Sequence, residues 1–254
     1  MTVPAIRARR SGTAGAPLLV LGPSLGTSTL VWDSAATLLA PHYEVIAWDL
    51  PGHGLSAPAR ESFSMTELAD AVLELAEGRC FHYSGVSLGG AVGLELALRH
   101  PDRLHRLAMV CSLAAFGQPE AWRARAAQVR VQSTSVLVGA SAGRWFSPDS
   151  IARLPEVTGR LLHDLADTDD ESYALCCEAL AGYDLTRQLG SLAVPLLAIS
   201  GADDPVATTT AVAELAAAVP DGRAADIPGA GHQASAEMPD AVAALLIEFL
   251  GRDV

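Results

Sequence analysis

The residues best suited to chemistry centre on a serine in the sequence Gly85-Val86-Ser87-Leu88-Gly89. The motif follows a short apolar run and precedes a helical pattern, which predicts a sharp turn between a strand and a helix. On such a turn the serine hydroxyl stands above the edge of a sheet, and small neighbours let the backbone approach closely. A glycine-rich loop without chemistry has the same sequence pattern, so the interpretation depends on whether Ser87 has partners.

Two further strand ends supply candidate partners for Ser87. A serine needs a base to become nucleophilic near pH 7, and the base needs a group that fixes its tautomer. His232 follows one predicted strand, and the tandem acids Asp203 and Asp204 follow the strand before it. The chain order Ser, Asp, His is the one expected on an α/β sheet. We therefore expect Ser87 to be the nucleophile, His232 the base and Asp204 the orienting acid, with Asp203 as the alternative.

Each partner taken alone has an ordinary structural explanation. An aspartate after a strand is often a helix cap, and a histidine after glycine is often a loop residue, but three such residues at successive strand ends favour a triad. His53, which stands between two glycines in a turn, is expected to be a structural hydrogen bonder rather than a base. The oxyanion hole is expected to use the backbone N–H groups of Leu25 and Leu88, helped by the positive end of the helix that starts at Leu88.

These residues require a sheet that brings the strand ends together. Apolar runs predict strands near residues 18–21, 43–49, 80–84, 104–111, 192–200 and 224–227. Helical periodicity predicts helices near residues 28–39, 64–77, 88–100, 208–219 and 236–250. The alternation predicts an α/β fold with a mainly parallel sheet flanked by helices.

The pattern changes to helices without strands between residues 117 and 189, which predicts an inserted helical lid. The core would then consist of residues 1–116 and 190–254, and the lid would exclude water and shape a pocket. Between residues 118 and 160 there are six arginines and three acids. Most of these arginines are expected on solvated helix faces. Arg144 and Trp145 are the exception, because an arginine beside aromatic residues suits a pocket wall, and Ser24, in the turn after the first strand, is expected to line the same pocket.

Composition excludes several other functions. The formal net charge is −12 and every basic side chain is an arginine, which argues against a nucleic-acid partner and against lysine chemistry. No apolar run is long enough to span a membrane, and the run at residues 17–21 is too short for a signal peptide, so a cytoplasmic protein is expected. The four cysteines show no metal-ligand spacing. We expect neither a metal nor a cofactor, and the sequence leaves the oligomeric state open.

Across almost its full length the chain resembles the α/β-hydrolase superfamily, through the serine motif and the triad order. Several segments also resemble 3-oxoadipate enol-lactonases of the β-ketoadipate pathway of aromatic catabolism. These segments are residues 21–27 with Trp32-Asp33, 49–56, 85–91, 144–146, 173–180 and 229–232. Residues 144–146 and 173–180 are the most particular of them. The start of the chain departs from the family, because only about 15 residues precede the first clear strand, which abbreviates the usual leading hairpin.

The resemblance implies hydrolysis of a small anionic lactone, 3-oxoadipate enol-lactone, to 3-oxoadipate. Ser87 would attack the lactone carbonyl, His232 would transfer protons, and Arg144 would bind the substrate carboxylate. Within the same fold, a carboxylesterase, a carbon–carbon bond hydrolase or a perhydrolase are the alternatives. A non-catalytic ligand receptor is the alternative from a different class.

Overall fold

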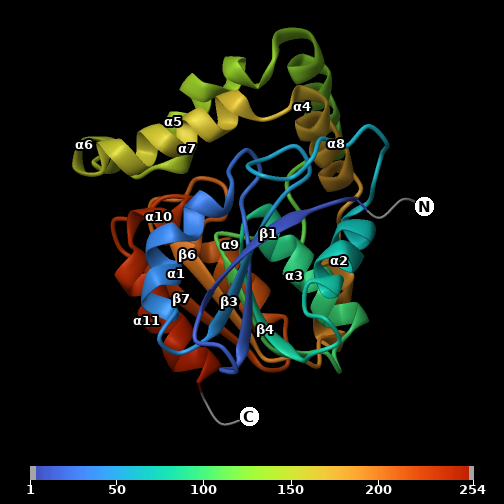
Figure 1. The fold of residues 1–254 in the computed structure, drawn as a ribbon. Coiled ribbons are helices and arrows are strands. Elements are labelled where there is room, and N and C mark those ends of the chain that lie inside the picture. The colour runs from blue at the N-terminus through green and yellow to red at the C-terminus, as the bar shows by residue number, and fades with distance from the viewer. Residues whose placement is uncertain (1–3, 252–254) are drawn as a thin grey trace.

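The structure, a computed structural model, describes residues 4–251 and is built around a seven-stranded sheet (Figure 1). The strand order is β1-β3-β2-β4-β5-β6-β7. The strands are β1 (Arg7–Gly12), β2 (Leu18–Gly22), β3 (Glu44–Asp49), β4 (Phe81–Val86), β5 (Leu104–Val110), β6 (Leu196–Gly201) and β7 (Gly222–Ile227). β1 runs antiparallel to β3, and every other neighbouring pair in this sheet is parallel. The predicted α/β class with a mainly parallel sheet is confirmed.

Helices cover both faces of the sheet, with α1 and α11 on one side and α2 and α3 on the other (Figure 1). These elements are a 3-10 turn η1 (Thr29–Trp32), α1 (Asp33–Leu39), α2 (Met65–Glu74), α3 (Leu88–Arg99), α9 (Thr209–Ala217), α10 (Ala234–Glu237) and α11 (Pro239–Leu250). α2 begins at a capping box formed by Ser64 and Glu67, as the sequence predicts. The predicted helix at 236–250 is divided near Pro239, because proline cannot continue the hydrogen-bond ladder of α10.

A helical insertion, residues 117–189, lies across one end of the molecule, at the top of Figure 1. Its elements, with a 3-10 turn that begins inside it and ends just beyond it, are α4 (Pro119–Gln132), η2 (Thr134–Leu137), α5 (Val138–Trp145), α6 (Ser150–Arg153), α7 (Pro155–Asp167), α8 (Asp170–Ala181) and η3 (Thr186–Ser191). The chain leaves and re-enters the core side by side, because Ala115 and Asp184 form an isolated antiparallel bridge. The division into a core and a lid stays a hypothesis.

The strand β1 is the element that the sequence analysis did not predict. Its residues are almost all exposed and include three arginines, so they carry neither the apolar run of a buried strand nor a clear alternation. β2 shows the opposite case, since it is buried along its whole length and its apolar run was sufficient to predict it. Among residues 4–251, no helix has both the length and the apolar character that crossing a membrane requires. The cytoplasmic location stays a prediction.

Candidate active site

Ser87 occupies a strained turn between β4 and α3. Its backbone φ is +53° and ψ is −115°, in a region that residues with a Cβ rarely adopt. Glycines make the turn possible: a Cβ added at Gly85 would lie 2.2 Å from the carbonyl carbon of Gly89, and one at Gly89 would lie 2.5 Å from that of Gly22. The G-x-S-x-G spacing therefore follows from close backbone packing, and it leaves Ser87 at the N-terminal end of α3.

The end of β5 holds the strained turn in place. The amide of Ser87 donates to the carbonyl of Val110 at 2.9 Å, and the hydroxyl of Ser112 donates to the carbonyl of Ser87 at 2.7 Å. Between them, Cys111 also has a positive φ of +48°, and its thiol donates to the carbonyl of Gly231 at 3.5 Å. The β5 end thus connects the serine turn to the loop that precedes His232.

Asp204 and His232 form a buried pair. Their side chains meet at 2.8 Å between Oδ2 of Asp204 and Nδ1 of His232, and each residue is 4% exposed. A carboxylate accepts hydrogen bonds, so Nδ1 carries the proton and Nε2 of the neutral ring is the acceptor. The second carboxylate oxygen accepts the amide of Val206 at 2.7 Å. Asp203 is exposed, so of the two acids it is Asp204 that the structure brings to the histidine.

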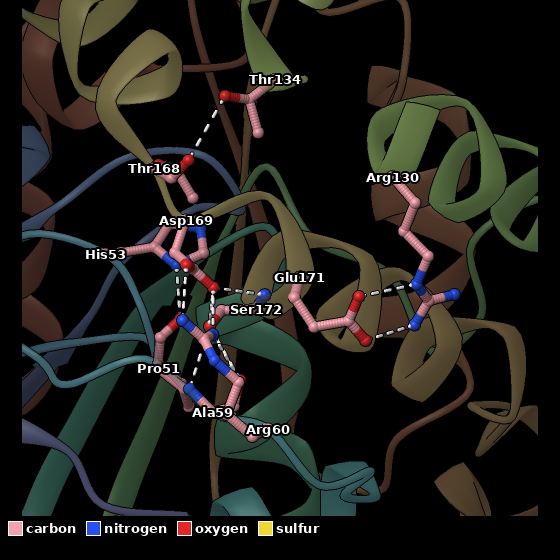
Figure 2. Close-up of polar contacts among 10 residues, drawn as sticks. All are labelled: Pro51, His53, Ala59, Arg60, Arg130, Thr134, Thr168, Asp169, Glu171 and Ser172. Carbon is pink, nitrogen blue, oxygen red and sulfur yellow. Dashed lines mark hydrogen bonds and ion pairs between the residues drawn. The ribbon is translucent and has the colours of Figure 1, made fainter. Parts of the chain in front are cut away.

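The loop after β2 and the start of α3 each present one amide without a backbone acceptor. Within residues 4–251 no hydrogen-bond acceptor is found for the amide of Leu25, and Leu88, as the first residue of α3, has no intrahelical acceptor for its own. His53 holds this loop: its Nε2 accepts the amide of Gly26 at 3.1 Å, and its Nδ1–H donates to the carbonyl of Pro51 at 2.8 Å (Figure 2). Burial lowers the pKa of His53 to about 4, so it stays neutral near pH 7, which agrees with the structural role predicted for it.

A cavity of about 90 Å³ lies between the sheet edge and the insertion. From the core it is lined by Ser24, Leu25, Ser87, Val206 and His232, and from the insertion by Trp122, Arg125, Ser141, Arg144, Trp145 and Tyr173. Six of the eight predicted site residues therefore line one cavity. Asp204 lies behind His232, and Leu88 follows Ser87 at the start of α3. Ser24 accepts a hydrogen bond from the side-chain amide of Gln233 at 3.2 Å.

Arg125, Trp122 and Tyr173 line the cavity although the sequence analysis did not select them as site residues. A solvated helix face was expected for Arg125; this is wrong, because the side chain is half-buried with its guanidinium 4.8 Å from the centre of the Trp122 ring. The neighbouring tryptophan could have singled it out, as Trp145 singled out Arg144. Burial raises the pKa of Tyr173, against the opposing charges of Arg125 and Arg144, so the hydroxyl is protonated near pH 7.

Glu237 is a second residue near the site whose role could not be predicted from the sequence. Its buried carboxylate accepts the amide of Gly231 and the amide of Ser147, both at 2.8 Å. Next to it, the amide of Gln233 donates to the carbonyl of Trp145 at 3.0 Å. The loop that carries His232 is thereby bonded to the end of α5, although the two segments are far apart in the chain.

The start of α8 is attached to the core by a charged cluster (Figure 2). Arg60 donates to both carboxylate oxygens of Asp169, at 2.7 and 3.1 Å, and Asp169 caps α8 by accepting the amide of Ser172 at 2.9 Å. Burial raises the pKa of Asp169, but the bonds from Arg60 and Ser172 outweigh it and hold that pKa at about 2. No group of three or more histidine, cysteine or acidic residues among residues 4–251 is arranged to hold a metal ion.

Known proteins share both the sequence pattern and the fold of this chain. A family model described as the alpha/beta hydrolase fold matches residues 17–239. The chain is 36% identical to 3-oxoadipate enol-lactonase 2 of Acinetobacter baylyi over 200 residues, which cover 78% of this chain and 75% of that protein. It is 30% identical to the pimeloyl-(acyl-carrier protein) methyl ester esterase of Aeromonas hydrophila, over 92% of this chain and 96% of that one. The solved structure of the enol-lactonase from Burkholderia xenovorans LB400 matches with a TM-score of 0.93 at 33% identity, over 97% of this chain and 96% of that one.

Proposed function

This chain belongs to the alpha/beta hydrolase family, and from that premise we propose that it hydrolyses 3-oxoadipate enol-lactone through Ser87, His232 and Asp204. The observation that carries the proposal is that one small cavity is lined by Ser87, His232 and Arg144. Such a cavity combines a nucleophile and a base with a cation, and it therefore suits an ester that carries a negative charge. The names of two similar proteins, from Acinetobacter baylyi and Burkholderia xenovorans, support a lactone as the ester.

Acylation begins at the serine hydroxyl. Nε2 of His232 takes the hydroxyl proton as Oγ of Ser87 attacks the lactone carbonyl, and Asp204 stabilises the imidazolium through Nδ1. The negative charge that develops on the carbonyl oxygen is bound by the amides of Leu25 and Leu88. Collapse breaks the ring carbon–oxygen bond, and the ring oxygen leaves as an enol with the proton of His232. Because an enol is a better leaving group than a simple alkoxide, this step needs less help from protonation by His232.

Deacylation repeats the same proton transfers with water. His232 removes a proton from a water molecule that attacks the acyl carbonyl, and it then returns the proton to Oγ of Ser87 as the acid leaves. The product carries two carboxylates, the one already present in the substrate and the one released from the acyl-enzyme, and the enol released in the first step becomes a ketone. Burial of His232 and Asp204, at 4% exposure each, keeps the two groups aligned through both steps.

Arg144 is proposed to bind the carboxylate that the substrate already carries. Its helix, α5, ends beside Trp145, which lines the same cavity. Guanidinium groups match planar carboxylates with paired hydrogen bonds, so Arg144 would orient the lactone as well as attract it. The esterase among the similar proteins makes a neutral ester the alternative substrate.

A spectrophotometric assay with freshly generated 3-oxoadipate enol-lactone tests the proposal. We expect the absorbance of the enol-lactone to fall with wild-type protein, and we expect Ser87→Ala to reduce turnover by at least about 10⁴-fold while the fold is retained. A fluorophosphonate probe should label the wild-type protein and leave Ser87→Ala unlabelled. Efficient hydrolysis of p-nitrophenyl esters without lactone turnover would favour a general esterase, and an absence of labelling would favour a ligand receptor.

A further inference from the structure

The six arginines between residues 118 and 160 fall into two groups by their partners. Four of them are engaged by protein groups: Arg123 with Glu120, Arg130 with Glu171 and Glu178, Arg160 with Asp33, and Arg153 with Ser150 and the carbonyl of Glu237. Figure 2 shows the pair between Arg130 and Glu171, in which both carboxylate oxygens accept at 2.8 Å. These four arginines therefore already have partners within the protein.

Arg125 and Arg144 form the second group. Neither has a carboxylate within 4.0 Å among residues 4–251, and both line the cavity that also contains Ser87. The protein has 29 acidic residues and a net charge of −12, so the lack of a carboxylate beside these two arginines is not due to a shortage of acidic residues. Two cations without an anion therefore face the same small space as the nucleophile.

The surroundings of Arg125 leave part of its guanidinium available to a ligand. The guanidinium carbon lies 4.8 Å from the centre of the Trp122 ring, and the group interacts with the Tyr173 hydroxyl, so its remaining N–H groups can donate to an anion. The protonated hydroxyl of Tyr173 supplies a further donor at the same wall of the cavity. Burial and the neighbouring charge of Arg125 both lower the pKa of Arg144, which shows that the two charges repel each other. An anion between them would remove that repulsion.

We propose that Arg125 and Arg144 together form a two-arginine clamp for the carboxylate of the substrate, with Arg125 as a specificity-determining residue. The inference rests on the proposed function, because it assigns the charged part of that substrate to a second residue. The ligand class is a short-chain carboxylate whose ester carbonyl lies within reach of Ser87. The cavity volume of about 90 Å³ restricts the class to small molecules.

Paired substrates test the clamp by kinetics. Wild type, Arg125→Ala, Arg125→Gln and Arg123→Ala are assayed on 3-oxoadipate enol-lactone and on its methyl ester, which lacks the free carboxylate. Arg123 is the matched control, since it lies on the same helix but is exposed and paired with Glu120. We expect both Arg125 variants to lower kcat/KM for the carboxylate by about 10- to 100-fold and for the methyl ester by less than about threefold. Arg123→Ala should change neither value by more than about threefold.

Binding of adipate measures the same clamp without catalysis. Adipate is a dicarboxylate that cannot be hydrolysed, and Trp122 and Trp145 in the cavity wall provide a fluorescence signal. We expect the dissociation constant of adipate to rise by about 10-fold or more in the Arg125 variants and to stay within about threefold in Arg123→Ala. Arg125→Gln preserves most of the side-chain volume and decides the result if Arg125→Ala does not fold.

The two readouts separate the clamp from the proposed function. Unchanged substrate preference and unchanged adipate binding in the Arg125 variants overturn the clamp, even if the wild type is a lactonase. A wild type that prefers the methyl ester overturns the proposed function. In that case weaker adipate binding in the Arg125 variants would still support the clamp, and unchanged binding would overturn it as well.

Discussion

The sheet edge that carries Ser87 and the insertion above it are held by different kinds of contact. At the edge, glycines are required by space, since a Cβ at Gly85 or Gly89 would lie 2.2 or 2.5 Å from backbone carbon. In the insertion, a Cβ added at the helical glycines Gly139, Gly143 or Gly159 would have no neighbouring atom within 4 Å. Backbone packing therefore fixes Ser87, whereas the position of the insertion depends on side chains.

Polar side chains make several of the contacts between the insertion and the core. Asp164 on α7 accepts the amide and the hydroxyl of Ser28, Arg60 pairs with Asp169 at the start of α8, and Glu237 reaches the amide of Ser147 beyond α5. Each of these contacts joins residues that are far apart in the sequence. The comparison indicates that the proposed catalytic groups lie in local sequence motifs, while the cavity wall supplied by the insertion is positioned by contacts between distant residues, which no local pattern reveals.

The largest effect is expected at the sheet edge. Asp204→Asn should lower kcat by about 10³- to 10⁴-fold, because an amide in place of the carboxylate no longer holds His232 in the tautomer that leaves Nε2 free. Asp203→Asn should stay within about threefold of wild type, since the side chain is exposed. Enol-lactone turnover measures both variants. The reverse ranking would assign the orienting role to Asp203.

A second prediction for the sheet edge concerns His53 and the pH dependence of the free energy of unfolding. Burial lowers its pKa to about 4, so the folded state excludes a proton that the unfolded chain binds below pH 6.5. The stabilisation is fully present above pH 6.5 and is lost as the pH falls through about 4, with a total near 3 kcal/mol for a shift of this size. Chemical denaturation of wild type and His53→Gln between pH 4 and 7 measures it.

A second buried histidine, His82, must be separated from His53 in this measurement. His82 is also buried, with a pKa lowered to about 4, and it contributes equally to both proteins. The free energy of unfolding should therefore fall by about 3 kcal/mol more in wild type than in His53→Gln between pH 7 and pH 4. Parallel curves for the two proteins would show that His53 is not a buried neutral group.

The contrast between the regions explains what the sequence could predict. The strand ends before Ser87 and Asp204 were predictable, because β4 and β6 lie in the interior of the sheet and are buried along their whole length. β7, before His232, is mostly exposed, and only its last residues, 224–227, were predicted as a short strand. The choice of Asp204 over Asp203 was also possible, although only the structure shows which carboxylate meets Nδ1. β1 was missed because an exposed edge strand has no apolar signal.

The insertion wall was only partly predictable. Arg144 was selected from its aromatic neighbours, whereas Arg125 on α4 was assigned to a solvated helix face together with most arginines between residues 118 and 160. Its role depends on which of the six arginines find carboxylates, and those carboxylates lie on α4, α8 and α1. Pairing of this kind depends on tertiary structure and has no local sequence signature.

Glu237 should have an intermediate effect, because it bonds the two regions to each other. Glu237→Gln replaces one carboxylate oxygen by an NH2 group, so one of the two amides, Gly231 or Ser147, loses its acceptor and the other keeps only a neutral one, which should lower the free energy of unfolding by about 2 kcal/mol. It should also raise KM for the carboxylate lactone, since α5 carries Arg144. Glu214→Gln, an exposed acid on α9, is the control and should change stability by less than about 0.5 kcal/mol. Lower stability with unchanged KM would restrict Glu237 to a structural role.

The smallest effect is expected at Arg60, which tests how strongly one exposed ion pair holds the insertion on the core. Its side chain is 61% exposed, so its pair with Asp169 is well solvated even though two hydrogen bonds are made. Exposed pairs contribute little to stability and are screened by salt, so Arg60→Ala should have a denaturation midpoint close to that of wild type at low ionic strength. In 1 M salt the difference from wild type should nearly vanish, because the Debye length falls to about 3 Å. A salt-independent loss of stability larger than that of Glu237→Gln would show that this pair, rather than the capping of α8 by Asp169, fixes the insertion on the core.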